Sequence, residues 1–326
     1  MTEYKELLGL FSKRLSEHVA DLQHKKPVEL YGPEAYILEL GGKRLRPLLA
    51  LIACELFGKD PREAIDAALS VELFHNFSLI HDDILDQAPL RRNHPTVHTK
   101  WNTNIAILSG DAVLVKAFQA LGTYEAETAR KLTNIFSKTA IEVCEGQQLD
   151  MNFENMDSVS VDDYIHMITY KTAVLLGCSL QMGAIIAKTS PADQEHLYEF
   201  GKHLGISFQL LDDLLDAFAE NPEKFGKKTG GDILANKKTF LTLNALENAN
   251  SAQSEEIRKV LAMEASDDKI KKMLSLYKTL RAEKHCREEA DKHTRIALQH
   301  LEKLSARESE KTKLRTFALN LLNREL

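Results

Sequence analysis

Two eight-residue runs, 79–86 (LIHDDILD) and 209–216 (QLLDDLLD), set three aspartates in the same pattern among apolar residues, and they begin 130 residues apart. In a helix that turns 100° per residue, Asp82 and Asp86 share one face and Asp83 lies beside them. Carboxylates within one turn repel, and apolar surroundings raise the cost of their charge. A hard divalent cation between the carboxylates removes both problems. The repeated pattern therefore predicts two facing acidic clusters that hold a metal-bound polyanion, such as a magnesium diphosphate.

Two other Asp-Asp pairs, 162–163 and 267–268, differ from these runs because they follow Ser160 and Ser266 in polar surroundings. That position is typical of first-turn acids after an N-cap. The acidic runs lie instead in apolar stretches near the expected ends of helices, where the macrodipole also disfavours negative charge. The candidate metal ligands are Asp82, Asp83, Asp86, Asp212 and Asp216, with Asp213 beside the last two.

Both acidic runs follow the same kind of helix start. A capping side chain stands before a proline in both 60–63 and 190–193, and an acid follows two residues after that proline. The capping residue precedes the first motif aspartate by 22 residues in both cases. The pattern predicts helices over 61–87 and 191–218. If unbroken, each would place its cluster roughly 33 Å from the helix start.

The remaining sequence predicts an all-α fold in a single domain, residues 1–326. Hydrophobic residues make up 44% of the chain, which is enough for a sizeable core. Leu, Ala, Glu and Lys recur at helical spacing and strand signals are few, which indicates about ten to thirteen helices. Those helices are expected near 3–23, 45–58, 61–87, 103–122, 125–150, 161–188, 191–218, 237–248, 251–264, 267–303 and 307–324. Two segments with proline and glycine, 87–101 and 221–236, are expected to be loops that follow the acidic runs.

Composition narrows the partners and the location. The net charge is −6 without a basic tract, which argues against nucleic acid. The N-terminal segment is charged and amphipathic, which does not fit a signal peptide, and no apolar run approaches the length of a membrane span. Four scattered cysteines without metal-ligand spacing are expected to be buried thiols in a reducing cytoplasm.

Cations recur beside the acidic runs. Residues 41–47 (GGKRLRP) place Lys43 and Arg46 on one side of a helix start, and two arginines follow Asp86 by five and six residues. Arginine forks suit phosphate oxygens, whereas lysine contributes a point charge. Each cation alone is also explained as a solvated side chain. The candidates for binding a diphosphate are Lys43, Arg46, Arg91, Arg92, Lys171 with Thr172, Lys227 and Lys237. Gln209 and the Gln147-x-x-Asp150 pair are further candidates or ordinary buried amides.

These motifs in combination resemble the trans-prenyltransferases, the isoprenyl diphosphate synthases, over most of the chain. The shared segments are GGKRLRP, the run from His75 through DDILDQAPLRR, GQQLD at 146–150, Lys171-Thr172, QLLDDLLD and GKKTGGDILANKK. The resemblance implies an antiparallel all-α barrel around a deep central cavity, usually a homodimer. It implies head-to-tail condensation of isopentenyl diphosphate with an allylic diphosphate: dimethylallyl, geranyl or farnesyl diphosphate.

The same resemblance implies a role for each matching residue. Asp82 and Asp86, with Asp212 opposite, would hold about two to three Mg²⁺ ions that bridge the allylic diphosphate. That diphosphate would also contact Arg91, Lys171, Thr172, Gln209 and Lys227. Isopentenyl diphosphate would bind Lys43, Arg46, His75 and Arg92, with Lys237 close to a closing loop. The departing diphosphate takes the final proton, so no protein base is expected.

Product length is assigned by the family pattern rather than by geometry. Phe77 and Ser78 are the fifth and fourth residues before the first motif aspartate. Ser78 lies on the carboxylate face of an ideal helix, whereas Phe77 is about 140° from Asp82 and is equally well explained as core packing. Family members with an aromatic at this fifth position and a small fourth residue resemble geranylgeranyl-type synthases. A C20 product is therefore expected, with C15 or a longer chain as alternatives.

Three other classes of protein compete with this interpretation. A class I terpene cyclase usually replaces the second acidic run and lacks the cations for isopentenyl diphosphate. A di-iron bundle would use Glu72-x-x-His75, but it needs a second such pair, which the chain does not contain. A non-catalytic synthase subunit would be expected to lose one acidic run. Both runs are present.

Overall fold

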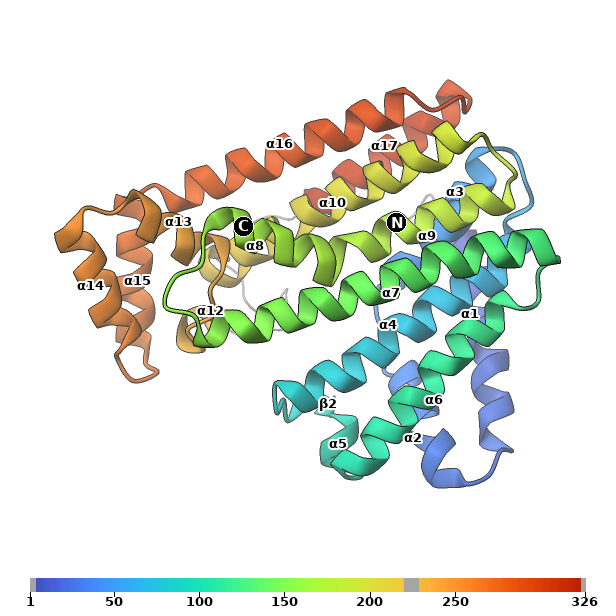
Figure 1. Ribbon diagram of the computed structural model, residues 1–326, viewed down its shortest axis with the longest axis horizontal. Helices are drawn as coiled ribbons and strands as arrows, with labels where there is room; N and C mark the ends of the chain where they lie inside the picture. Colours follow the sequence, from blue (N-terminus) through green and yellow to red (C-terminus); the bar gives the residue numbers. More distant parts are fainter. Residues whose placement is uncertain (1–3, 220–228, 324–326) are drawn as a thin grey trace. The chain divides into compact units, whose positions relative to one another are not determined.

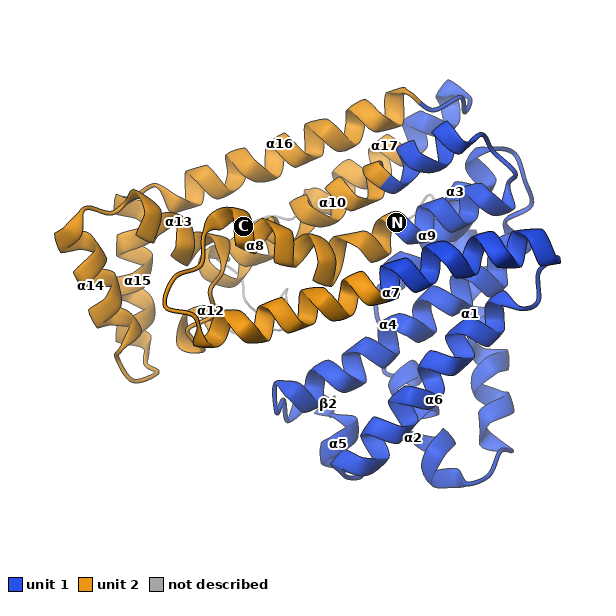
Figure 2. Cartoon of the chain, viewed as in Figure 1, with its two compact units in different colours: residues 1–140, 178–198, 304–313 blue, residues 141–177, 199–303, 314–326 orange. Residues whose placement is uncertain are grey.

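A computed structural model describes residues 4–219 and 229–323 (Figure 1). The described chain is helical apart from one two-residue hairpin, so the all-α prediction is confirmed. It divides into two compact units (Figure 2): residues 1–140, 178–198 and 304–313 form unit 1, and residues 141–177, 199–303 and 314–326 form unit 2. The boundary falls within α7 (Ala126–Asn155), α9 (Val174–Ile186), α10 (Pro191–Phe218) and α17 (Glu308–Leu322). The single domain, the barrel and its cavity remain predictions.

Unit 1 is built around α4, the helix that carries the first acidic run. Its own helices are α1 (Lys5–Gln23), α2 (Val28–Glu39), α3 (Leu45–Leu56), α4 (Ile65–Leu85), α5 (Val97–Lys100) and α6 (Thr103–Leu121). Residues 67–74 of α4 are all buried, since α3 and α6 both pack against this helix. Gly110 of α6 permits the approach, because a Cβ there would lie 2.4 Å from Nε2 of His81.

The expected start of α4 is corrected by the structure. The Asp60 carboxylate accepts the backbone N–H of Arg62 at 3.0 Å, but the segment that it caps, Pro61–Ala64, is a 3₁₀ turn, and the α-helix begins at Ile65. The second start behaves as predicted. The Ser190 hydroxyl accepts the backbone N–H of Asp193 at 3.1 Å, and α10 runs unbroken to Phe218.

The segment expected to be a loop at 87–101 contains a hairpin, β1 (Leu90–Arg91) paired with β2 (His94–Pro95), followed by α5. The two turn residues, Arg92 and Asn93, have φ of 53° and 62°. Positive φ at both central positions is the geometry of a type I′ turn, which matches the twist of a two-residue hairpin. The turn therefore fixes where Arg92 leaves the backbone.

Unit 2 contains the core around α10 and the second acidic run. Its own helices are α8 (Val161–Ile168), α12 (Gly231–Leu234), α13 (Phe240–Asn248), α14 (Ser251–Leu261), α15 (Asp267–Thr279) and α16 (Ala282–Glu302). Ile206, Leu210 and Leu214 of α10 pack with Phe240 and Tyr277 in one buried cluster. The predicted caps are confirmed: Ser160 forms a capping box with Asp163, and the Ser266 hydroxyl accepts a backbone N–H in the first turn of α15.

Several predicted helices are broken or were missed. The helix expected over 161–188 is interrupted by a π turn at Thr169–Ala173. The helix expected over 267–303 is split before Arg281, which has φ of 58°. Helix α2 was not predicted, and neither was α12 inside the loop expected at 221–236.

The cysteines and helix α6 bear on two expectations from composition. Three cysteines are buried, but Cys144 is exposed, so the prediction of four buried thiols is wrong. Among the described helices, only α6 is long and apolar enough to cross a membrane. One such helix is weak evidence for a membrane span, and α6 packs against α2 and α4.

Candidate active site

The first acidic run closes α4 and separates its aspartates by environment. Asp86 is the exposed C-cap of the helix, and the side chain of Asp82 is 23% exposed. Asp83 turns inward and is only 1% exposed. The run therefore presents Asp82 and Asp86 outward, whereas Asp83 belongs to the interior of unit 1.

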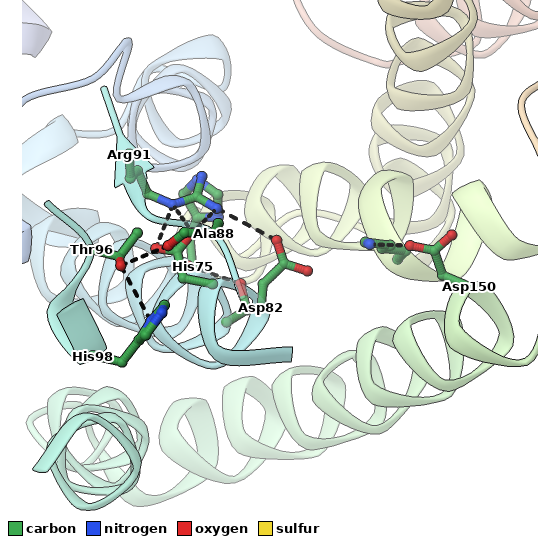
Figure 3. A network of polar contacts seen from close by, with 10 residues as sticks. His75, Asp82, Ala88, Arg91, Thr96, His98 and Asp150 are labelled. Carbon is green, nitrogen blue, oxygen red and sulfur yellow. Dashed lines mark hydrogen bonds and ion pairs between the residues drawn. The ribbon is translucent and has the colours of Figure 1, made fainter. Parts of the chain in front are cut away.

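Asp83 is the partner of Arg91 in the hairpin. Nε of Arg91 donates to the two carboxylate oxygens of Asp83 at 2.9 and 2.8 Å, and its Nη2 lies 3.5 Å from Asp82 (Figure 3). Burial raises the pKa of the Asp83 carboxyl, although the guanidinium opposes that shift. The Asp83–Arg91 pair, together with the hydroxyl of Thr96, which donates to the carbonyl of Ala88 at 2.8 Å, ties the hairpin to the end of α4.

A cluster of cations lies in unit 1 around a second buried carboxylate, Glu72. Arg44, at the N-cap of α3 with φ of 48°, donates to the Glu72 carboxylate and to the carbonyl of Leu38. Asn76 donates to the same carboxylate at 3.0 Å. The Glu72 carboxylate is therefore paired with the Arg44 guanidinium, which does not support the di-iron interpretation of Glu72-x-x-His75.

Arg46 and His75 are brought together as predicted for one binding site. Nη1 of Arg46 lies 3.2 Å from Nε2 of His75. Burial, and then the nearby charge of Arg46, hold the pKa of His75 well below its usual value, so the imidazole is neutral and accepts from the guanidinium. Burial lowers the pKa of Arg46 to about 10, but the group remains charged at neutral pH, and its Nε is buried without a hydrogen-bond partner.

The paired glycines of GGKRLRP make room for Arg92. The Arg92 guanidinium donates to the carbonyl of Gly41, and a Cβ at Gly42 would lie 2.7 Å from its Nη2. Gly42 also has φ of 129°, which L side chains rarely adopt. The turn before α3 and the hairpin after α4 therefore meet at this guanidinium, while Lys43 is exposed in the same turn.

The charges of this cluster do not balance within unit 1. Arg44 is paired with Glu72 and Arg91 with Asp83, but in the described part of the chain neither Arg46 nor Arg92 makes an ion pair. A partly buried guanidinium, Arg46, and an exposed one, Arg92, lie near a neutral imidazole and could bind an external anion, because arginine forks match phosphate oxygens.

The second acidic run, in unit 2, also has one inward aspartate. Asp213 is 4% exposed and accepts from the hydroxyl of Tyr164 at 2.5 Å and from Nε2 of Gln209 at 3.3 Å. Burial raises the pKa of Asp213 to about 8, which favours the protonated carboxyl over the charged one. Asp212 and Asp216 are less buried. The middle aspartate of each run is therefore an internal anchor.

Asp216 and the segment that follows it are connected through the backbone. The carboxylate of Asp216 accepts the N–H of Asp232 at 3.0 Å, and its carbonyl accepts from Gly230 at 2.6 Å. Of the two lysines predicted in this segment, Lys237 is exposed, and Lys227 lies outside the described residues.

Lys171 and Thr172 lie in the π turn. Single π turns inside α-helices are frequent at functional sites. The Lys171 ammonium forms an ion pair with Asp150 of α7, whose carboxylate is drawn in Figure 3. The Gln147-x-x-Asp150 pair of the sequence analysis therefore contributes through Asp150, which holds Lys171.

The structure does not preform a metal cage from the predicted carboxylates. In the described residues, no three His, Cys, Asp or Glu side chains are grouped to hold a metal ion, and the two acidic runs belong to different units. Mg²⁺ typically binds one or two protein carboxylates together with substrate phosphates rather than an all-protein cage. Asp82, Asp86, Asp212 and Asp216 are more exposed than Asp83 and Asp213, so they are the aspartates that fit such a role.

Phe77 lies in an aromatic cluster of unit 1. Its ring centroid is 4.7 Å from that of His81 and 5.6 Å from that of Phe74. The side chain is 8% exposed. The hydroxyl of Ser78 donates to the carbonyl of His75 at 2.8 Å, within the same helix.

Sequence reasoning missed the residues that hold the site together. Arg44, Glu72, Tyr164 and Lys238 act through partners that are distant in the chain; Lys238, for example, donates to the carbonyls of residues at the C-terminal end of α7. Only Arg44 carried a usable signal, since it stands between Lys43 and Arg46 in the motif. Glu72 was considered only for the di-iron alternative, and Tyr164 and Lys238 have ordinary local contexts.

Comparisons with known proteins agree with this architecture. The model of the polyprenyl synthetase family matches residues 27–277. A geranylgeranyl diphosphate synthase of Methanosarcina mazei is 43% identical over 224 residues, covering 68% of this chain and 69% of that protein. A short chain isoprenyl diphosphate synthase of Methanothermobacter thermautotrophicus is 34% identical over 310 residues, covering 93% and 94%. The crystal structure of a geranylgeranyl pyrophosphate synthetase from Pyrococcus horikoshii Ot3 has a TM-score of 0.91 at 33% identity, covering 99% of this chain and all of that one.

The described chain is an all-α protein with two acidic runs and a cluster of arginines in unit 1. The matches go further: the chain belongs to the polyprenyl synthetase family. The family predicted from the sequence motifs is confirmed.

The Asp83–Arg91 pair generates a stability prediction. Arg91→Ala leaves a buried carboxylate without its cation, so the free energy of unfolding measured by urea denaturation should fall by about 3 kcal/mol. Asp83→Asn in the same chain should recover part of that loss, because the amide needs no counter-charge. Equal losses in the single and double variants would show that the pair does not stabilise the fold.

Proposed function

We propose that this chain is a Mg²⁺-dependent prenyltransferase that condenses isopentenyl diphosphate with an allylic diphosphate, head to tail, to give geranylgeranyl diphosphate. Membership in the polyprenyl synthetase family and the synthases at 34–43% identity support short-chain prenyl transfer. The structural observation that carries the assignment is the uncompensated pair of guanidinium groups, Arg46 and Arg92, beside the neutral His75.

The proposed roles follow from the charges of each group. Arg46, Arg92 and Lys43 bind isopentenyl diphosphate, with the neutral His75 orienting Arg46 through their hydrogen bond. Lys171, held by Asp150, contacts the allylic diphosphate, with Thr172 beside it in the same turn. Arg91 is committed to Asp83 but lies close enough to Asp82 to neutralise that carboxylate in part. Gln209 and Lys227 complete the proposed contacts.

The chemistry requires the loss of a diphosphate leaving group and a dry environment for the resulting allylic cation. Mg²⁺, held by Asp82, Asp86, Asp212 and Asp216, would supply charge neutralisation of that leaving group. Fixed guanidinium and ammonium groups stabilise the same developing charge electrostatically. No side-chain nucleophile is needed, and the leaving diphosphate is the proposed acceptor of the final proton.

The test of the metal role is Asp82→Ala. Condensation of radiolabelled isopentenyl diphosphate should fall by about 10²–10³-fold, the range for loss of one group that stabilises the transition state. Far-ultraviolet circular dichroism should be unchanged, because this outward carboxylate lies at the end of α4. Asp162→Ala, in the first turn of α8, is the matched control and should leave turnover intact. Full turnover by Asp82→Ala would remove it from the metal site.

We propose a C20 product, with farnesyl (C15) and longer chains as alternatives. The support is the aromatic at position 77, whose ring is packed and therefore fixed in place. A fixed ring at the end of the growing chain would stop elongation by its bulk. The relative from Methanosarcina mazei is itself a geranylgeranyl diphosphate synthase.

Phe77→Ala tests the chain-length assignment. Products sized after reaction with labelled isopentenyl diphosphate should become longer than those of the unmodified chain. Phe74→Ala removes the neighbouring ring of the same cluster and controls for lost packing, which costs about 3–5 kcal/mol at a buried phenylalanine. The same product length in both variants would reject Phe77 as the gate.

We further propose that the chain works as a homodimer through the outer face of α6. Ile107, Leu108 and Val115 of this helix are 42%, 61% and 57% exposed. Apolar side chains in such a stripe are typical of an interface with a second protein surface. A second copy of the same chain fits the family expectation.

Leu108→Asp would place a charge in this stripe and should convert the protein to a monomer in sedimentation equilibrium. Val28→Asp is the matched control, because Val28 is 63% exposed but lies on α2. A dimer that persists at the same concentration in Leu108→Asp would exclude this face of α6 from the interface.

A class I terpene cyclase remains the second candidate by fold, but the residues do not favour it. The second acidic run keeps all three aspartates, and the cations assigned to isopentenyl diphosphate are present in unit 1. A cyclase has no use for a second diphosphate site.

A further inference from the structure

The π turn at Thr169–Ala173 departs from the α-helices on both sides of it. The N–H of Val174 donates to the carbonyl of Thr169, five residues earlier, and the turn before it is held by the Thr169 hydroxyl, which donates to the carbonyl of Ile165 at 2.6 Å. An extra residue in a helical turn rotates the side chains around it. The turn therefore sets the direction in which Lys171 and Thr172 leave the backbone.

Helix α7 approaches this turn at a glycine. A Cβ built on Gly146 would lie 2.2 Å from the backbone N and 2.7 Å from Cα of Lys171. It would also lie 2.7 Å from the carbonyl carbon of Tyr170. These are backbone atoms, so no rotamer change can relieve the contact, and even alanine would push the turn away from α7.

Helix α10 approaches the same turn at a second glycine. A Cβ on Gly205 would lie 2.7 Å from Cα and 2.9 Å from Cβ of Ala173. Gly146 meets the turn at Lys171 and Gly205 meets it two residues later. The two glycines form a slot that fits the π turn, and all of these residues belong to unit 2.

Helix α7, which supplies one side of the slot, also carries the carboxylate that pairs with Lys171. Asp150, which forms the ion pair with Lys171, lies four residues after Gly146 in α7, and residues four apart share a helix face. One face of α7 therefore admits the Lys171 backbone and receives its ammonium.

We propose that Gly146 and Gly205 are positioning residues for the allylic diphosphate: the slot between them fixes the π turn, and through it the placement of Lys171 and Thr172. This inference rests on the proposed function, because it deepens the role given there to Lys171. The glycines themselves touch no substrate.

Gly146→Ala tests the slot by steady-state kinetics. Because a displacement of about 1 Å can cost 10²-fold, kcat/KM for the allylic diphosphate should fall about 10²-fold, with a higher KM for this substrate. The KM for isopentenyl diphosphate, whose proposed ligands are in unit 1, should stay within about twofold. Hydrogen exchange at the amides of residues 169–174 should be faster than in the unmodified chain, a readout that needs no activity.

Gly183→Ala is the matched control. A Cβ at Gly183 would lie 2.2 Å from the carbonyl oxygen of Ala50, an equally close backbone contact in unit 1, away from the slot. It should lower the thermal midpoint, and because Ala50 lies one turn after Arg46 in α3, any change in kinetics should fall on the KM for isopentenyl diphosphate and not on that for the allylic diphosphate. The same rise of the KM for the allylic diphosphate in Gly183→Ala and Gly146→Ala, or unchanged kinetics in Gly146→Ala, would overturn the proposal.

Gly205→Ala keeps the proposal testable where Gly146→Ala does not fold. It should also raise the KM for the allylic diphosphate, and Ala173→Gly in the same chain should partly restore it by removing the Cβ that it meets. Failure of that second change to restore the KM would count against the slot. If the unmodified chain shows no condensation, the proposed function fails, whereas unchanged hydrogen exchange in Gly146→Ala would refute the slot alone.

Discussion

Charge buried among apolar helices must be compensated, and this constraint organises the whole site. Asp83 is compensated by Arg91, and Glu72 by Arg44, so these pairs serve the fold. Among residues 4–219 and 229–323, Arg46 has no carboxylate in an ion pair with it, and it lies beside a neutral imidazole. The two pairs fix the elements of unit 1, and the positive charge that they leave unpaired is the basis of the anion site proposed above. In unit 2 the same constraint raises the pKa of the buried Asp213, whose carboxyl accepts hydrogen bonds from Tyr164 and Gln209.

Features that depend on local sequence could be predicted, whereas features that depend on distant partners could not. The caps at Ser160 and Ser190 and the unbroken helix after Ser190 were predicted because a hydroxyl finds its backbone partner three residues away. The hairpin was missed, since its turn residues, Arg92 and Asn93, lack the glycine that usually announces a type I′ turn. That turn is held by contacts to the segment before α3, 51 residues earlier.

For the candidate site, spacing alone predicted which residues gather but not which way they face. The motif placed three aspartates within about one helical turn, and only the tertiary fold decided that Asp83 and Asp213 point inward. The π turn around Lys171 was equally hidden, because the sequence there is compatible with an uninterrupted helix. The residues that accommodate it lie elsewhere in the chain, Gly146 of the GQQLD segment and Gly205 of α10, and no local pattern links either glycine to the turn.

The type I′ turn that carries Arg92 has a consequence for protein engineering. A residue with a Cβ in the left-handed region costs roughly 1–2 kcal/mol, and glycine or asparagine would sit there more comfortably. Selection for heat resistance alone would therefore favour exchanging this arginine and would remove a guanidinium group that is proposed to bind diphosphate. Mutant libraries for thermostability should leave Arg92 unchanged, because stability favours glycine or asparagine there, whereas the proposed diphosphate binding needs the arginine.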